Sequence, residues 1–215
     1  MAENWKELRQ SEKLGDVILM VTSGERCFRL TKDDVTEITE LRSTQEEADT
    51  RMMIHVKHAA TSYQNVVVNS EDTDVFLILL SLHSQIPTRI LLRRGKGNAV
   101  GLIDIPRLGT ILGEDVCQAM IGVHCSRYTG CDSVSAFGGQ GNIKALNLII
   151  KSHEYRQLFT SFGEEWHVTE NVFQRVQAFT CNMYCSNTNT KLVNKLRYEM
   201  FCVKICDIRA PTMQS

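Results

Sequence analysis

The feature that most constrains the fold is a short run of β-branched residues directly after an amphipathic segment. Asn65–Ser70 contains three consecutive valines, a composition typical of an interior strand in a parallel sheet. Residues 43–60 before it carry apolar side chains at helical spacing, and Thr44 and Glu47 have the spacing of a capping box. A helix followed by a buried strand is half of a βαβ unit. We therefore predict an α/β fold with a mainly parallel central sheet and helices on both faces.

The flanking segments extend this pattern in both directions. Asp16–Thr22 is predicted to be a buried strand and Arg26–Leu30 its hairpin partner, whereas Val35–Leu41 fits a strand or a short helix equally well. Downstream, helices are expected over Val75–His83, Ile105–Leu112 and Glu114–His124, and strands over Thr88–Arg93 and Val100–Ile105.

Composition narrows the class of protein. The 215 residues include 24 basic and 25 acidic side chains, a net charge of −1, which excludes a basic surface over the whole protein. No apolar run approaches the roughly 20 residues of a membrane span. The first residues lack the apolar core of a secretory signal, and eight cysteines in such a chain are typical of reduced thiols. The expectation is an intracellular protein, nuclear or cytoplasmic, with no membrane partner.

Three acidic clusters stand where an α/β sheet places functional groups. They are Glu46–Asp49 at a helix start, Glu71–Asp74 after the predicted buried strand, and Asp132 in Thr129–Asp132. Ligands of open parallel sheets bind at the carboxyl ends of strands. Gathered carboxylates repel one another unless a hard cation neutralises them, and Mg²⁺ or Mn²⁺ fits oxygen ligands. Two such ions about 4 Å apart could activate water and stabilise the leaving oxygen of a phosphodiester.

Each acidic cluster also has a plain structural explanation. Glu47 could serve only in the capping box, Asp72 and Asp74 could be turn formers, and Asp132 could be an ordinary loop aspartate. Within the first cluster, Glu47 and Asp49 are two residues apart and would not share a face of a regular helix, whereas Glu46 and Asp49 would. A capping position for Glu47 would remove this conflict, so Glu47 and Asp49 remain the candidates, with Glu46 in reserve.

The clusters resemble the motifs of a known nuclease family. Glu47-Ala48-Asp49 resembles the Glu-Ala-Glu signature that opens the internal nuclease region of flap endonucleases, and Glu71–Asp74 resembles their Glu-Asp-x-Asp motif. Thr129–Ser133 is similar to their Gly-x-Asp motif, and Phe137–Ile149 to the glycine turn of their helix-two-turn-helix. All four motifs occur in the family's order, over about residues 44 to 152. These stretches also resemble transposon-associated animal proteins of the same nuclease type.

The resemblance implies a domain organisation and a function. It implies a PIN-like nuclease core with a helix-two-turn-helix at 44–152. The sequence pattern adds an N-terminal hairpin and lead-in strands at 1–43 and a helical extension at 153–215. The activity implied is metal-dependent, structure-selective hydrolysis of branched, nicked or flap DNA. The implied metal ligands and catalytic residues are Glu47, Asp49, Asp72, Asp74 and Asp132, and the implied contacts to the nucleic-acid backbone are Gly139, Gly141 and Lys144.

One departure from the family bears on activity. Flap endonucleases begin with a strand bearing an aspartate, and a second aspartate follows; both help to hold the metals. Fewer than 50 residues precede the first acidic cluster here, and Asp16, Asp33 and Asp34 are poor substitutes. The N-terminal half of the family domain is expected to be missing. A complete site would hold two ions, and this chain has ligands for one. The alternative is a non-catalytic remnant that binds nucleic acid or protein.

Cysteine, histidine and basic residues elsewhere in the chain suggest alternative chemistry. The pairs Cys181/Cys185 and Cys202/Cys206 could suggest zinc, although no Cys-x-x-Cys occurs. His124 beside Cys125 could suggest a cysteine nucleophile, but adjacent residues rarely point at each other. The basic turn Arg93–Gly97 could contact phosphate or be an ordinary solvated turn.

Overall fold

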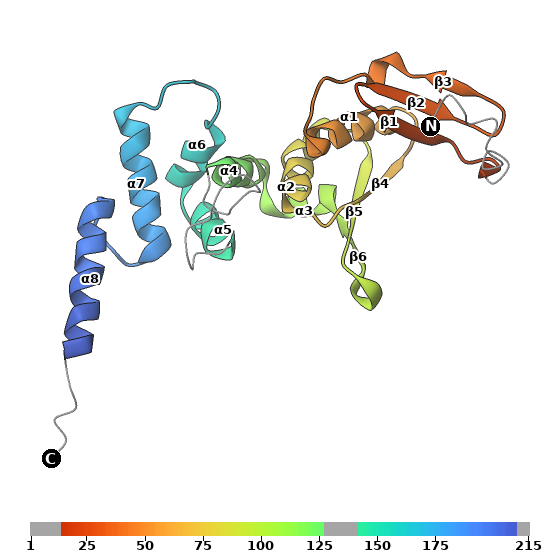
Figure 1. Cartoon of the computed structure of the whole chain (residues 1–215). Coiled ribbons are helices and arrows are strands. Elements are labelled where there is room, and N and C mark those ends of the chain that lie inside the picture. The colour runs from red at the N-terminus through yellow and green to blue at the C-terminus, as the bar shows by residue number, and fades with distance from the viewer. Residues whose placement is uncertain (1–13, 127–141, 210–215) are drawn as a thin grey trace. The chain divides into compact units, whose positions relative to one another are not determined.

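The computed structural model describes residues 14–126 and 142–209 and shows an α/β protein (Figure 1). The chain forms two compact units. Unit 1 consists of the residues up to Glu71 together with Gln85–Asp104, and unit 2 consists of Asp72–Ser84 together with the residues from Ile105 onward. The division into 1–43, 44–152 and 153–215 stays a prediction.

Unit 1 begins with an antiparallel sheet. The strands β1 (Leu19–Ser23), β2 (Arg26–Leu30) and β3 (Val35–Glu37) pair in that order, and Ser23 faces Arg26 across the β1–β2 turn. Gly24 has a φ of 59° in that turn, a conformation that favours glycine. The predicted hairpin is confirmed. The segment Val35–Leu41, which fitted a strand or a short helix equally well, contains both: β3 and a 3-10 helix at Thr39–Leu41.

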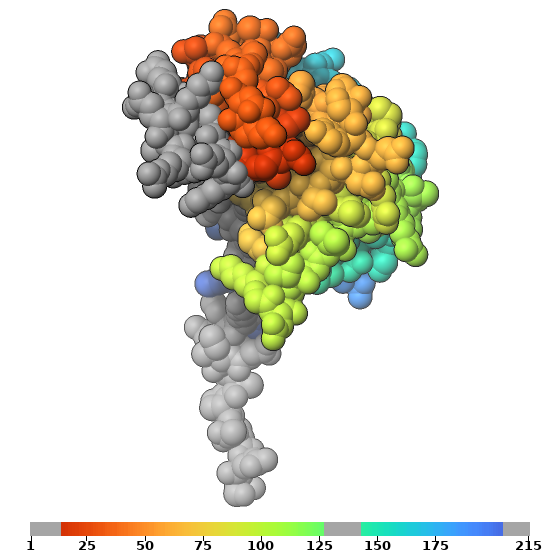
Figure 2. Space-filling model, turned by 90° about the vertical axis from the view of Figure 1, so that its right-hand side faces the viewer, coloured from red at the N-terminus to blue at the C-terminus, as the bar shows by residue number. Residues whose placement is uncertain are grey.

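The prediction that the first strand is buried is wrong. Val17 is 60% exposed, Leu19 is also exposed, and β1 contains no fully buried residue. The segments of the N-terminal sheet, red to orange in Figure 2, lie at the surface of unit 1. A run of apolar residues cannot by itself distinguish a covered strand from one at the edge of a small sheet, because only the sheet order decides which neighbours cover it.

Helix α1 (Ala48–Ala60) follows, with Met53 and Val56 on its buried face. The predicted capping box is wrong, since Glu47 is the N-cap residue and makes no side-chain cap hydrogen bond. Hydrogen bonds from the side chain of Arg51 stabilise the start of the helix instead. The guanidinium of Arg51 donates to the carbonyl oxygens of Gly24, at 2.7 Å, and Ser43, at 2.8 Å. The start of α1 is thereby tied to the β1–β2 turn.

The second sheet contains β4 (Asn65–Asn69), β5 (Arg89–Arg94) and β6 (Gly101–Asp104), in that order. β4 and β5 are parallel, and β5 and β6 are antiparallel. Among the described residues this is the one parallel pair, so the mainly parallel central sheet is not confirmed. β4 is an edge strand rather than an interior one: Val67 is 55% exposed, whereas Val68 is buried.

Unit 2 is helical in the described part of the chain. Its helices are α2 (Thr73–Leu82), α3 (Ile105–Leu112), α4 (Glu114–Cys125), α5 (Asn142–Lys151), α6 (His153–Thr160), α7 (Glu170–Tyr184) and α8 (Val193–Arg209). The helices predicted over Val75–His83, Ile105–Leu112 and Glu114–His124 are therefore confirmed to within two residues. The predicted turn before α5 lies outside the described residues.

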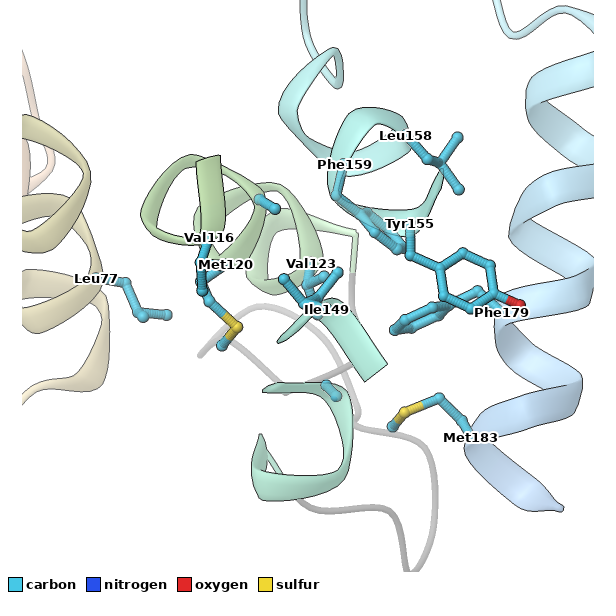
Figure 3. Close-up of a cluster of buried hydrophobic side chains, with 12 residues drawn as sticks. Leu77, Val116, Met120, Val123, Ile149, Tyr155, Leu158, Phe159, Phe179 and Met183 are labelled. Atoms are coloured by element: carbon cyan, nitrogen blue, oxygen red, sulfur yellow. The ribbon is translucent and has the colours of Figure 1, made fainter. Parts of the chain in front are cut away.

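Side chains from five of these helices form the core of unit 2 (Figure 3). Leu77 comes from α2, Met120 and Val123 come from α4, and α5 to α7 supply the remainder. The ring of Phe179 packs edge-to-face against Phe159, at 4.6 Å between centroids, and against a second aromatic ring of α6. Burial of these large apolar side chains holds α4, α6 and α7 together.

Among the described helices, none is both long enough and apolar enough to cross a membrane.

Candidate metal centre

Asp72 and Asp74 both lie at the start of α2. Asp72 is the N-cap residue, with an extended backbone, and its Oδ1 accepts a hydrogen bond from the backbone N–H of Asp74 at 2.9 Å. Aspartate is favoured at this position because its carboxylate satisfies a helix N–H that has no partner within the helix. The cap explains why α2 begins at Thr73, and it fixes one oxygen of Asp72.

The two carboxylates lie close together. A carboxylate oxygen of Asp72 and one of Asp74 are within 4.8 Å of each other. The positive end of the α2 dipole offsets part of their mutual repulsion. This capping role is the plain explanation for two acids at a helix start, and it applies here whether or not an ion binds.

Asp74 has a second partner, which no local sequence pattern indicates. The Nε2 of His124, in the last turn of α4, lies 2.7 Å from the Oδ1 of Asp74. His124 is only 5% exposed, whereas the side chain of Asp74 is 31% exposed. A charge-assisted hydrogen bond therefore joins the start of α2 to the end of α4 inside unit 2.

The first acidic cluster lies in unit 1. Glu47 is the exposed N-cap residue of α1, and Asp49 is half-buried in the first turn. The capping position of Glu47 is the arrangement that removes the register conflict with Asp49. Glu46 precedes the helix and is exposed.

Glu71 has a different role from its neighbours in the motif. One of its carboxylate oxygens accepts the backbone N–H of Gly95 at 2.7 Å, and its carbonyl oxygen accepts from the side chain of Arg94 at 2.7 Å. Glu71 thus ties the chain after β4 to the β5–β6 turn. The same contact engages one arginine of the basic turn Arg93–Gly97.

The remaining predicted site residues fall mostly outside the described part of the chain. Asp132, Gly139 and Gly141 lie in residues 127–141, which the structure does not describe. Lys144 is described: it lies in the first turn of α5 and is half-buried.

The donor set suits a hard divalent cation. The carboxylates of Asp72 and Asp74, both in unit 2, are candidates to hold a metal ion, and carboxylate oxygens are the ligands that Mg²⁺ and Mn²⁺ prefer. A group of exposed acids is not specific for a metal by itself. Among the described residues, no comparable group of cysteines and histidines occurs, so the zinc alternative gains no support there. His124 faces Asp74, and Cys125 beside it is exposed.

Comparison of the chain with models of protein families, with curated proteins and with solved structures found no match. The functional assignment therefore depends on the residues themselves.

Proposed function

We propose that this chain is a divalent-metal-dependent nuclease-type domain of the flap endonuclease-like, PIN-like class, acting on or binding DNA. The observation that supports this best is the proximity of Asp72 and Asp74 at the start of α2, within 4.8 Å. These two residues are the aspartates of the segment that resembles the Glu-Asp-x-Asp motif. Local structure and motif order thus point to the same pair of ligands.

In this proposal the chain's own residues have distinct roles. Asp72 and Asp74 hold Mg²⁺ or Mn²⁺, and Glu47, Asp49 and Asp132 complete the ligand set. A bound divalent cation supplies polarisation of a phosphodiester and lowers the pKa of coordinated water. Gly139, Gly141 and Lys144 position the nucleic-acid backbone, which carries no sequence information by itself. In this proposal, β4 and β5 correspond to part of the mainly parallel central sheet, with helices on both faces, that the sequence predicts.

One observation favours a second candidate function. Neither β1, β2 nor β3 contains an aspartate, so these strands do not supply the N-terminal metal ligands of the family. The second candidate is a non-catalytic remnant that binds nucleic acid or protein through the same surface. Binding needs the glycine turn and a few basic residues, whereas two-metal catalysis needs ligands that bridge both ions.

Thermal unfolding in the presence of Mn²⁺ tests the metal site. Binding to the native state alone stabilises it, by about 2.7 kcal/mol at a concentration 100 times the dissociation constant. We expect Mn²⁺ at millimolar concentration to raise the Tm of the full chain. The double variant Asp72→Asn/Asp74→Asn should lose this rise, because an amide is a poor ligand for a hard cation.

A matched double variant, Asp16→Asn/Asp33→Asn, removes two exposed acids of unit 1 and should keep the rise. If Mn²⁺ does not change the Tm of the unaltered chain, or changes that of the Asp72/Asp74 variant equally, the proposed metal site is wrong.

A nuclease assay distinguishes the two candidate functions. With Mn²⁺ and flap, nicked or single-stranded DNA, we expect weak cleavage or none, far below the roughly 1–10³ s⁻¹ typical of enzymes. The Asp72→Ala variant excludes a contaminating nuclease. Turnover in the typical range that Asp72→Ala abolishes would show that the site is complete. DNA binding without cleavage would favour the non-catalytic candidate.

A further inference from the structure

His124 is a buried polar side chain that contacts a candidate ligand within unit 2. It is 5% exposed, and its Nε2 lies 2.7 Å from the Oδ1 of Asp74. Burial of an imidazole is unfavourable unless its ring nitrogens have hydrogen-bond partners. One partner of this imidazole is a carboxylate of the candidate metal centre.

The helix that carries His124 is held in a fixed position. Gly122 approaches the backbone of α6 so closely that an added Cβ would overlap the carbonyl oxygen of Phe159. Val123 is fully buried in the core of unit 2. The end of α4 is closed by Ser126, whose N–H donates to the carbonyl of Gly122 at 3.0 Å and whose Oγ donates to that of Val123 at 2.9 Å. The imidazole of His124 therefore projects from a backbone with little freedom.

We propose that His124 is a positioning residue for Asp74, which rests on the function proposed above. The Nε2–H donates to Oδ1 and fixes the rotation of the carboxylate, so that its second oxygen is presented to the cation. Asp72 is held in a parallel way, because its Oδ1 accepts the N–H of Asp74. Both ligands are thus oriented before an ion binds, which lowers the entropic cost of binding.

A half-buried histidine, His83, shows what a purely structural role looks like. His83 has a side chain that is 10% exposed, and its Nδ1 lies 2.7 Å from the carbonyl oxygen of Leu80. Its Nε2 is 3.7 Å from Glu114, which is outside the candidate site. Loss of His83 would disturb the scaffold of unit 2 without touching Asp72 or Asp74, and this makes it the matched control.

The experiment measures the Mn²⁺ dissociation constant of the full chain from the electron paramagnetic resonance signal of free Mn²⁺, together with the Tm of each variant. His124→Leu removes the donor, and we expect affinity to fall about 10–100-fold, the usual effect of losing a group that orients a ligand. His124→Gln places an amide N–H close to the original Nε2 and should bind within about threefold of the unaltered chain. His83→Gln should change the Tm but leave the affinity unchanged.

The remaining outcomes overturn the inference. If His124→Leu binds Mn²⁺ as tightly as the unaltered chain while Asp72→Asn/Asp74→Asn does not bind, the positioning role is wrong and the metal site stands. If His83→Gln weakens binding as much as His124→Leu, affinity follows stability and the positioning role is again wrong. If the unaltered chain does not bind Mn²⁺, the proposed function and this inference both fall. If His124→Leu does not fold, His124→Asn replaces it, because the shorter amide does not reach Asp74; equal affinities of the Asn and Gln variants would overturn the inference.

Discussion

At the scale of single residues, Glu37 shows how charged hydrogen bonds shape unit 1. Its carboxylate accepts from the guanidinium of Arg26, at 2.7 Å, and from that of Arg42, at 2.6 Å. These two hydrogen bonds join β3 to β2 and to the segment leading to α1. They lower the pKa of Glu37 from 4.5 to about 2, with the Arg26 hydrogen bond as the largest cause.

A pH dependence follows from this shift. Because the pKa of Glu37 is lower in the folded state, its contribution to stability is fully present above about pH 4.5 and is lost as the pH falls to about 2. We expect Glu37→Gln to lower the Tm at pH 6, and we expect the difference from the unaltered chain to shrink between pH 4.5 and pH 2. Both Arg side chains are exposed, so the effect should be small and should decrease in high salt. Glu25→Gln, at an exposed position, is the control; an unchanged difference down to pH 2 would contradict the prediction.

At the scale of elements, the approach of α4 to α6 organises unit 2. The two helices meet at Gly122, where the backbone of α6 occupies the space that a side chain would need. α6 itself begins at a Ser152 N-cap whose hydroxyl accepts the N–H of Tyr155. The cap fixes the start of α6, and the close contact at Gly122 fixes the position of the last turn of α4 against α6.

Substitution of Gly122 tests this contact. Helix propensity alone would favour Gly122→Ala by about 1 kcal/mol, but the new Cβ would overlap the backbone of Phe159, which cannot move as a flexible side chain can. We expect the overlap to dominate and to lower the free energy of unfolding by about 1–3 kcal/mol, measured by urea denaturation. Gly101→Ala, where an added Cβ meets nothing within 4 Å, should change stability far less. Greater stability of Gly122→Ala would mean that α4 and α6 lie further apart.

At the scale of the whole molecule, the chain passes from unit 1 to unit 2 within the acidic motif Glu71–Asp74. Glu71 is the last residue of the first segment of unit 1, and Asp72 is the first residue of unit 2. Each unit has its own buried thiols, Cys27 in unit 1 and Cys117 and Cys181 in unit 2. Burial raises the pKa of all three, to about 11 for Cys117, where the charges of Glu114 and Asp115 add to the effect.

Thiol labelling therefore reports on both units in one experiment. Thiolate is the reactive form and becomes scarce at pH 8 when the pKa is raised. Iodoacetamide at pH 8 should modify the exposed Cys125 and Cys185 of the native chain and spare Cys27, Cys117 and Cys181. Mass spectrometry of the digested protein measures each site, and labelling in guanidinium, where all should react, is the control. Equal rates for Cys117 and Cys185 in the native chain would contradict the described burial.

The sequence by itself determined the local elements. The spacing of apolar residues located α2, α3 and α4, and the turn at Gly24 located the first hairpin, because periodicity and turn preference act between residues close in the chain. The pair Asp72 and Asp74 was likewise predictable, since two residues that flank the start of one helix are near each other in any fold that forms it.

Only the tertiary structure decided the features that depend on residues far apart in the sequence. The edge position of β4 follows from the order of the strands in its sheet, and the start of α1 follows from Arg51 reaching Gly24 rather than from a capping box. The contact between His124 and Asp74 joins residues 50 positions apart. No local pattern encodes such contacts, because they arise only when packing of the core brings separate helices together.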